Sequence, residues 1–213
     1  MANLRYIKLK INNFFRDNML ILIFILVCFI GGSIAGSVAA NTLTYQQKTV
    51  LLNYLSGFIT EVNELLSDNQ QLITRNVILA NLKYALLFWV LAITLVGVVA
   101  IPLLIILRGF IVGFTSTFLI REMFFKGALL ALTSIMPQNL ILVPSLILGG
   151  FLSCIFVFRF GGGILTGRKY NLKRMLVGYS FSMVGIALLL FLAALVEIYV
   201  VPYLLRLVEG IVI

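Results

Sequence analysis

The stretch from Met19 to Ala40, MLILIFILVCFIGGSIAGSVAA, contains no charged residue. A helix needs roughly 20 apolar residues to cross the hydrocarbon core of a bilayer, so this stretch predicts a membrane-spanning helix. The composition agrees, because hydrophobic residues make up 62% of the chain, charged residues 11%, and the mean hydropathy is +1.15. A soluble domain of this composition would expose large apolar patches. The 213 residues therefore predict one all-α domain, a polytopic membrane helix bundle.

Two basic segments set the predicted orientation of this bundle. Residues 1–18 form a basic head before the first apolar run, and residues 159–176 contain several basic residues and no acid. The positive-inside rule predicts that both segments are cytoplasmic. The net charge of +9 is therefore interpreted as a topology signal and not as a surface for nucleic acid.

The other apolar runs, placed between these signals, predict about five crossings with the N-terminus inside and the C-terminus outside. We expect the second crossing at residues 84–107, ending inside at Arg108. The fourth runs inward over residues 140–158. The last runs outward over residues 178–199 and leaves residues 201–213 as an external tail, with Glu197 solvated at its outer end.

Residues 41–81 form the largest polar segment, which the first crossing delivers outside. Thr44 and Gln47 have the spacing of a capping box, and apolar residues follow at helical spacing. These apolar residues are Leu51, Leu52, Leu55, Phe58, Ile59, Val62, Leu65 and Leu66. Such a face packs on the bundle, lies in the outer membrane interface or docks an external protein. The candidates for docking are Leu51, Leu55, Phe58, Ile59 and Val62.

The expected third crossing, residues 109–136, is anomalous. As one helix it would be about 42 Å long, against a bilayer core of about 30 Å. Charges fall in its middle, where each unpaired one costs about 3 kcal/mol. Glu122 and Lys126 are four residues apart and can pair, and Gly127 offers a break. We expect a helix interrupted near 121–127, with its charges in a polar cavity or at an interface. The intramembrane polar candidates are Arg108, Arg121, Glu122 and Lys126.

The stretch Met136-Pro137-Gln138-Asn139-Leu140 is a polar, helix-breaking cluster between two apolar runs. Proline removes a backbone donor, so we expect irregular backbone here, buried in protein or facing water. The predicted topology places this cluster near the external side, between the third and fourth crossings. It is interpreted as a turn or as a corner of the docking surface, which adds Pro137, Gln138 and Asn139 to the docking candidates.

Glycines four residues apart occur at Gly32 and Gly36 and again at Gly109 and Gly113. This spacing permits close approach of membrane helices, and we expect it to serve packing inside the bundle.

The residues that usually carry enzyme chemistry are sparse in this chain. Histidine is absent, and Glu122 and Glu197 lie in different crossings. Cys28 and Cys154 are far apart within apolar runs, with no spacing typical of a metal site. We therefore expect no catalytic, metal or cofactor site. Intramembrane charges also occur on transport paths, so a small-solute transporter or channel using Arg121, Glu122 and Lys126 is the alternative function.

Several features together resemble the stage II sporulation protein M family along essentially the whole chain. They are the basic head before one crossing, Asn41-x-Leu43 to Gln46, Arg108-Gly109, Gly113-Phe114, and the 136–140 cluster with Val143-Pro144. The 136–140 cluster is the most specific of them.

The resemblance implies a membrane protein of endospore-forming bacteria that is needed when the mother cell engulfs the forespore. It implies a noncatalytic anchor that holds stage II sporulation proteins P and D, two peptidoglycan-degrading enzymes, at the septal membrane. The expected surroundings are the lipid bilayer, without nucleic acid or a cofactor. The residues leave the question of a homo-oligomer open.

Overall fold

The structure is a computed structural model that describes residues 12–54, 70–94, 96–166 and 172–204. These residues form helices and contain no strand. The elements are α2 (Met19–Asn41), α4 (Gln70–Ile93), α5 (Gly97–Leu130), the π-helix η1 (Ala131–Ile135), α6 (Met136–Thr166), α7 (Leu172–Leu195) and the π-helix η2 (Val196–Val200). Two shorter helical stretches cover residues 12–17 and 45–54.

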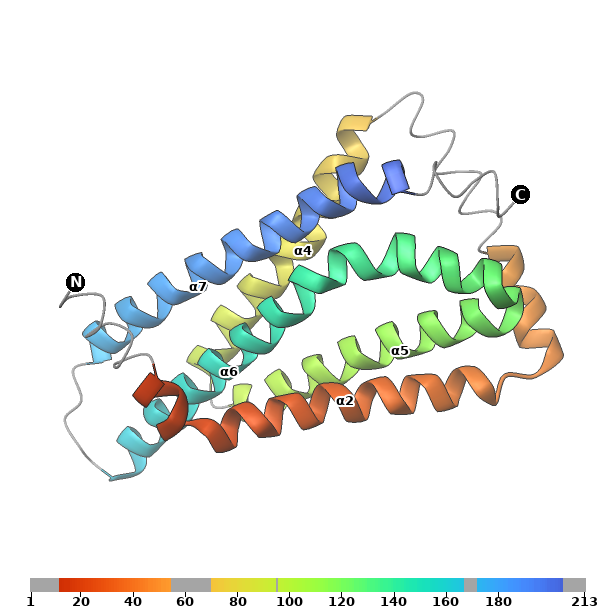
Figure 1. Cartoon of the computed structure of the whole chain (residues 1–213). Helices are drawn as coiled ribbons and strands as arrows, with labels where there is room; N and C mark the ends of the chain where they lie inside the picture. Colours follow the sequence, from red (N-terminus) through yellow and green to blue (C-terminus); the bar gives the residue numbers. More distant parts are fainter. Residues whose placement is uncertain (1–11, 55–69, 95, 167–171, 205–213) are drawn as a thin grey trace.

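The long helices run in alternating directions along the length of the molecule. In Figure 1, α2, α5 and α7 run one way, and α4 and α6 run the other. Four stretches of the described residues are long and apolar enough to span a membrane, and Gly97–Gly162 is by far the longest at 66 residues. As a straight helix it would reach roughly 99 Å, more than three times a bilayer core. It is folded back on itself, so it supplies two passes, and the predicted polytopic helix bundle is confirmed.

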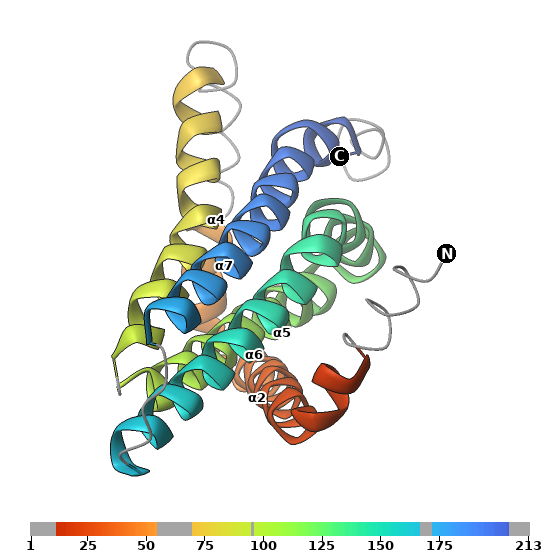
Figure 2. The same ribbon diagram turned by 90° about the vertical axis from the view of Figure 1, so that its left-hand side faces the viewer.

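Helix α6 lies at the centre of the bundle, because it contacts each of α2, α4, α5 and α7. Figure 2 shows α4 and α7 on one side of the α5–α6 pair and α2 on the other. In the most apolar 18-residue stretch of Gly97–Gly162, 61% of the residues are buried. In the corresponding stretches of the other three spans, 22–28% are buried. The outer helices therefore present most of their surface to lipid, as expected for a membrane bundle.

The seam between α2 and α5 is the most extensive helix contact in the described bundle. A Cβ atom on Gly32 or Gly36 would overlap a backbone carbonyl of α5, and one on Gly109 or Gly113 would overlap a carbonyl of α2. The backbones can approach this closely only because both partners lack side chains there. The predicted packing role of the two glycine pairs is confirmed.

A buried hydrogen-bond network joins α4, α6 and α7. The hydroxyl of Tyr179 donates to the backbone oxygen of Phe88 at 2.9 Å and lies 2.8 Å from Oγ of Ser153. Ser153 Oγ also lies 2.7 Å from the carbonyl oxygen of Gly149, and its single proton is shared between Gly149 and Tyr179. Ser153 and Tyr179 are buried, so this network satisfies polar groups that lipid could not.

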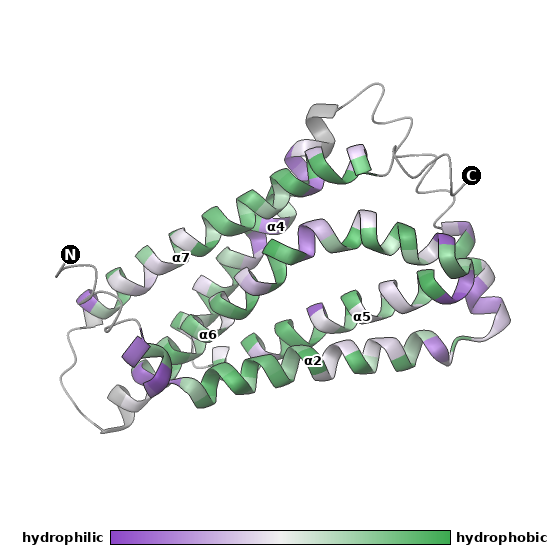
Figure 3. Ribbon diagram, in the orientation of Figure 1, coloured by the Kyte–Doolittle hydropathy of each residue, from purple (hydrophilic) through white to green (hydrophobic). Residues whose placement is uncertain are grey.

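The 12–17 stretch packs at the end of the bundle where α6 approaches α7. The ring of Phe15 stacks on Phe151 with centroids 5.5 Å apart, and the Arg159 guanidinium lies 5.8 Å from the ring centroid of Phe14. Figure 3 shows hydrophilic residues at this end and at the opposite end, around residues 45–54, with hydrophobic residues along most of the length between them. Residues 12–17 and the start of the basic loop, residues 159–166, therefore share one end.

The second crossing ends earlier than the sequence predicted. Helix α4 stops at Ile93, and the Gly97 amide donates to the carbonyl of Thr94 at 3.0 Å in a tight turn. The prediction of a crossing over 84–107 is therefore wrong. Arg108 does not end a crossing but lies about 16 Å along α5, at 1.5 Å per residue, roughly halfway through a bilayer core.

The reversal of Gly97–Gly162 occurs at Phe124, which has φ 49° and ψ −123°. This confirms the predicted break near residues 121–127. The break separates two passes through the bundle, whereas the prediction placed it within one crossing. The break turns the chain through a helical hairpin, so residues 109–136 are not one crossing. Gly127 lies against Leu119 across the hairpin, where a Cβ atom would overlap the Leu119 carbonyl oxygen.

The cluster at 136–140 is not a turn, because helix runs through it as the start of α6. Irregular backbone is present just before it as η1, whose wider turns suit a segment that leads into Pro137. The Asn139 side chain donates to the carbonyl of Ile135 at 2.7 Å, so it satisfies a carbonyl in the irregular segment. The expectations of a turn between two crossings and of irregular backbone within residues 136–140 are both wrong, because the irregular segment is η1, the five residues before this cluster.

Candidate functional site

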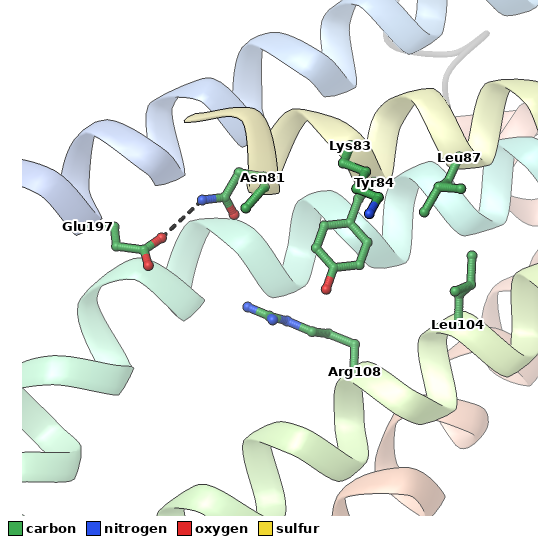
Figure 4. A pocket seen from close by; sticks show the side chains of 8 residues that line it. Asn81, Lys83, Tyr84, Leu87, Leu104, Arg108 and Glu197 are labelled. Carbon is green, nitrogen blue, oxygen red and sulfur yellow. Dashed lines mark hydrogen bonds between the residues drawn. The ribbon is translucent and has the colours of Figure 1, made fainter. Parts of the chain in front are cut away.

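A partly open polar cavity lies between α4, α5 and η2. Its volume is about 440 Å³. The lining residues are Ala80, Asn81, Lys83, Tyr84, Leu87, Leu104, Arg108 and Glu197. Figure 4 shows the Arg108 guanidinium and the Glu197 carboxylate directed toward this space from different helices. A cavity of this size with a few converging polar groups is the usual form of a small-ligand site.

Glu197 is held in place by two amide groups. Asn81, which is buried, donates from Nδ2 to Glu197 Oε2 at 3.0 Å. With its amide nitrogen turned toward the carboxylate, Gln138 donates to Oε1 at 3.0 Å and to Oε2 at 2.7 Å. Neutral donors orient the carboxylate but leave its charge in place.

Arg108 reaches the cavity from α5. Its guanidinium lies 5.5 Å from the ring centroid of Tyr84, a cation–π distance. Its Nε is buried and has no hydrogen-bond partner among the described residues. Arg108 and Glu197 line the same cavity without forming an ion pair with each other. A buried guanidinium nitrogen without an acceptor lowers the free energy of unfolding, because a donor that water would satisfy stays unpaired in the folded protein.

A second polar group lies at the tip of the α5–α6 hairpin. The ammonium nitrogen of Lys48, in the 45–54 helix, lies 2.6 Å from Oε1 of Glu122. Arg121 and Lys126 are exposed near the same tip. From Gly97 to Arg121 the helix covers about 36 Å, more than the roughly 30 Å core, so these charges need not lie inside the membrane. Their predicted position in the middle of a crossing is wrong.

Comparison with known proteins decides the family. The family model described as Stage II sporulation protein M matches residues 25–202. The chain belongs to this family. No curated protein and no solved structure matches the chain. The stage II sporulation protein M assignment and the apolar helices together make this a sporulation-related, multi-pass membrane protein.

The features that suggested the stage II sporulation protein M family occupy structurally important places. Gly109 and Gly113 form the α5 side of the tight seam with α2. The 136–140 cluster brings Gln138 to Glu197 at the cavity. Asn41 to Gln46 lead into the 45–54 helix, where the separately predicted cap forms and the Thr44 amide donates to Gln47 Oε1 at 2.9 Å. The motifs therefore mark a helix seam, a helix start and a side chain that holds Glu197, one of the residues lining the cavity.

The predicted docking residues fall in two places. Leu51 is half-buried on the 45–54 helix, whereas Leu55, Phe58, Ile59 and Val62 lie outside the described residues. Pro137, Gln138 and Asn139 lie on α6 and are half-buried. The structure brings Gln138 to Glu197 and leaves the docking role of this group a prediction.

Sequence reasoning missed the cavity because its residues are far apart in the chain. Glu197 was expected to be solvated, but it accepts hydrogen bonds from Asn81 and Gln138. Asn81 was placed in the external polar segment and was not singled out. One pattern in the sequence could have indicated the contact. Asn81 and Glu197 each interrupt an apolar run, and polar residues in membrane-spanning segments usually pair with one another.

Proposed function

We propose that this protein is a noncatalytic membrane anchor for peptidoglycan-degrading enzymes during forespore engulfment. The family assignment supports a role in sporulation. The observation that carries the anchor role is the 45–54 helix, which Lys48 ties to the α5–α6 hairpin. This helix presents Tyr45, Val50 and Tyr54 with 84%, 53% and 74% of their surfaces exposed. A fixed helix with exposed apolar and aromatic side chains suits the capture of a partner protein.

The distribution of charge supports an orientation for this anchor. Arg16, Arg159, Lys173 and Arg174 belong to the end of the bundle that holds residues 12–17. Under the positive-inside rule this end faces the cytoplasm, so the 45–54 helix faces the cell wall. The proposed partners, stage II sporulation proteins P and D, act on peptidoglycan on that side. We place the complex at the septal and engulfing membrane.

The alternative, transport through Arg121, Glu122 and Lys126, loses its main support. These residues lie at the hairpin tip, at one end of the bundle, and not along its middle (Figure 1). Their position suits a structural role at the membrane surface.

The test is capture of stage II sporulation proteins P and D from sporulating cells with the tagged full-length protein. One variant carries Val50→Asp and Tyr54→Asp, and a second carries Leu55→Asp and Phe58→Asp. We expect capture to fall about tenfold, because charge on an apolar docking face disrupts its central contacts. Thr49→Asp, on the same helix and exposed, is the matched control and should retain capture.

A third variant carries Arg121→Gln and Lys126→Gln. If capture persists in both face variants but is lost in this one, the docking surface is misplaced. If the unmodified protein captures neither enzyme, the anchor proposal is wrong.

A further inference from the structure

The polar cavity is separate from the proposed docking helix and has its own chemistry. Its α5 side, at Arg108, lies about 16 Å along the helix from the turn at residues 94–97. Asn81, Arg108 and Glu197 come from three different elements and converge there. Ionisable residues between membrane-spanning helices are costly and usually mark a ligand or ion site.

The charges in the cavity indicate what kind of ligand would fit. Arg108 and Lys83 supply two cationic groups, and Glu197 supplies one anionic group. The Nε of Arg108 is buried and lacks an acceptor, and the guanidinium forms no ion pair among the described residues, so no carboxylate balances its charge. A guanidinium binds phosphate or carboxylate oxygens strongly and in a fixed geometry. The cationic side of the cavity therefore suits an anionic oxygen group.

The opposite side of the cavity does not suit a simple anion. The Glu197 carboxylate is fixed by Asn81 and Gln138, and both of these donors are neutral. A ligand that carried only negative charge would bring like charges together in a region of low dielectric constant. An ammonium group would instead complete the hydrogen bonding of the carboxylate, which has about four acceptor positions.

We propose that this cavity binds a zwitterionic group, with a phosphate or carboxylate held by Arg108 and Lys83 and a primary ammonium held by Glu197. The ligand is either the headgroup of an ethanolamine lipid or a free zwitterion of the same chemistry. The volume of about 440 Å³ accommodates either one. The site does not depend on the anchor role, because its lining residues come from α4, α5 and η2 and not from the 45–54 helix.

The test measures binding to the full-length protein in a neutral detergent, by native mass spectrometry and by the shift in thermal unfolding. The zwitterionic probes are phosphatidylethanolamine, phosphoethanolamine and glycine. The purely anionic probes are phosphatidylglycerol and inorganic phosphate. We expect at least one zwitterionic probe to bind more tightly than both anionic probes. Binding of phosphatidylethanolamine alone identifies a lipid ligand, whereas binding of phosphoethanolamine or glycine identifies a free solute.

Two variants test which side chain of the cavity holds each charged end of the ligand. Arg108→Gln and Glu197→Gln should each weaken zwitterion binding about tenfold, because each removes one charge-assisted contact. Lys173→Gln, an exposed cation at the start of α7, is the matched control and should bind as the unmodified protein does. Glu197→Gln should also bind phosphatidylglycerol more tightly than before, a gain that a misfolded variant could not produce.

Three results would overturn the proposal. They are failure of all the zwitterionic probes to bind, equal or tighter binding of an anionic probe to the unmodified protein, and zwitterion binding that is unchanged in Glu197→Gln.

Discussion

The Oε1 atom of Glu122 lies 2.6 Å from the Nζ atom of Lys48, although the two residues are 74 positions apart in the chain. Glu122 lies just before the reversal at Phe124, and Lys48 lies in the first turns of the 45–54 helix. Their side chains are 18% and 28% exposed, so water screens the pair only partly. The pair therefore fixes the 45–54 helix against the α5–α6 hairpin.

Removing either charge of this pair should loosen the 45–54 helix. We expect Lys48→Gln and Glu122→Gln each to lower the free energy of unfolding by about 0.5–1 kcal/mol, as for other partly exposed ion pairs. Thermal unfolding of the full-length protein in detergent measures the change. Because the charges act as a pair, the double variant should cost less than the sum of the single variants.

The charge-swapped variant, Lys48→Glu with Glu122→Lys, should recover part of the lost stability. Arg121→Gln removes an exposed neighbouring charge and should change stability by less than about 0.5 kcal/mol. Strict additivity of the two single changes would show that the pair contributes no coupling.

The α2–α5 seam should reject any added side chain. We expect Gly36→Ala and Gly113→Ala each to destabilise the protein by about 1–3 kcal/mol, because the new methyl group would overlap a carbonyl oxygen of the other helix. The overlap also separates the donors Ser33 and Ser37 from the carbonyls of Gly109 and Gly113, which they reach at 3.2 Å and 3.3 Å. Thermal unfolding and cysteine cross-linking between the two helices measure both effects.

Gly31 is the matched control for the seam. It lies on α2 beside Gly32, but a Cβ atom there meets nothing within 4 Å. Gly31→Ala should therefore be neutral or stabilise the helix by up to about 1 kcal/mol, since alanine has the higher helix propensity. Equal losses for Gly31→Ala and Gly36→Ala would contradict the close approach.

The Tyr179 hydroxyl should contribute measurably to the contact between α4, α6 and α7. Tyr179→Phe leaves the carbonyl of Phe88 and the hydroxyl of Ser153 without this partner. We expect a loss of about 0.6–2 kcal/mol, the usual range for hydrogen bonds between membrane helices. Tyr199→Phe is the control, since Tyr199 is 64% exposed, and the two variants should differ clearly in thermal unfolding. Equal effects would show that the buried network adds nothing.

The parts of this fold that follow from local rules were predictable from the sequence. The apolar run at Met19 specifies α2, the Thr44 cap forms as expected, and the glycine pairs pack together. In each case the physical cause acts over one helix or one turn. A hydrophobic run, a capping oxygen and a missing side chain have the same effect wherever the helix is placed.

The boundaries of the crossings were not predictable in the same way. The turn at 94–97 lies between two apolar runs and has no charged residue to mark it. Without a signal for this turn, the sequence predicted that the second crossing ends at Arg108. It then predicted a turn between crossings at Pro137. The cavity was hidden for a related reason, because Asn81, Arg108 and Glu197 meet only through the packing of three elements.

Phe124 was also unpredictable, since sequence rules expect glycine where φ is positive. Its φ of 49° and ψ of −123° lie near the values of about +60° and −120° for the first central position of a type II′ turn. A phenyl side chain pays a strain of about 1–3 kcal/mol in such a conformation. The side chain is 79% exposed, so it gains little from burial. The surrounding hairpin packing imposes this conformation against local preference.

Replacing Phe124 by glycine should therefore stabilise the hairpin. We expect Phe124→Gly to raise the free energy of unfolding by about 1 kcal/mol, since relief of strain exceeds the entropy that glycine adds to the unfolded chain. Phe124→Ala keeps the strain of a Cβ atom and should give no such gain. Phe125→Gly is the matched control, because Phe125 is 72% exposed but helical, and glycine there should cost about 1 kcal/mol. Thermal unfolding that gives the two glycine variants the same sign would mean that the reversal does not depend on a positive φ at Phe124.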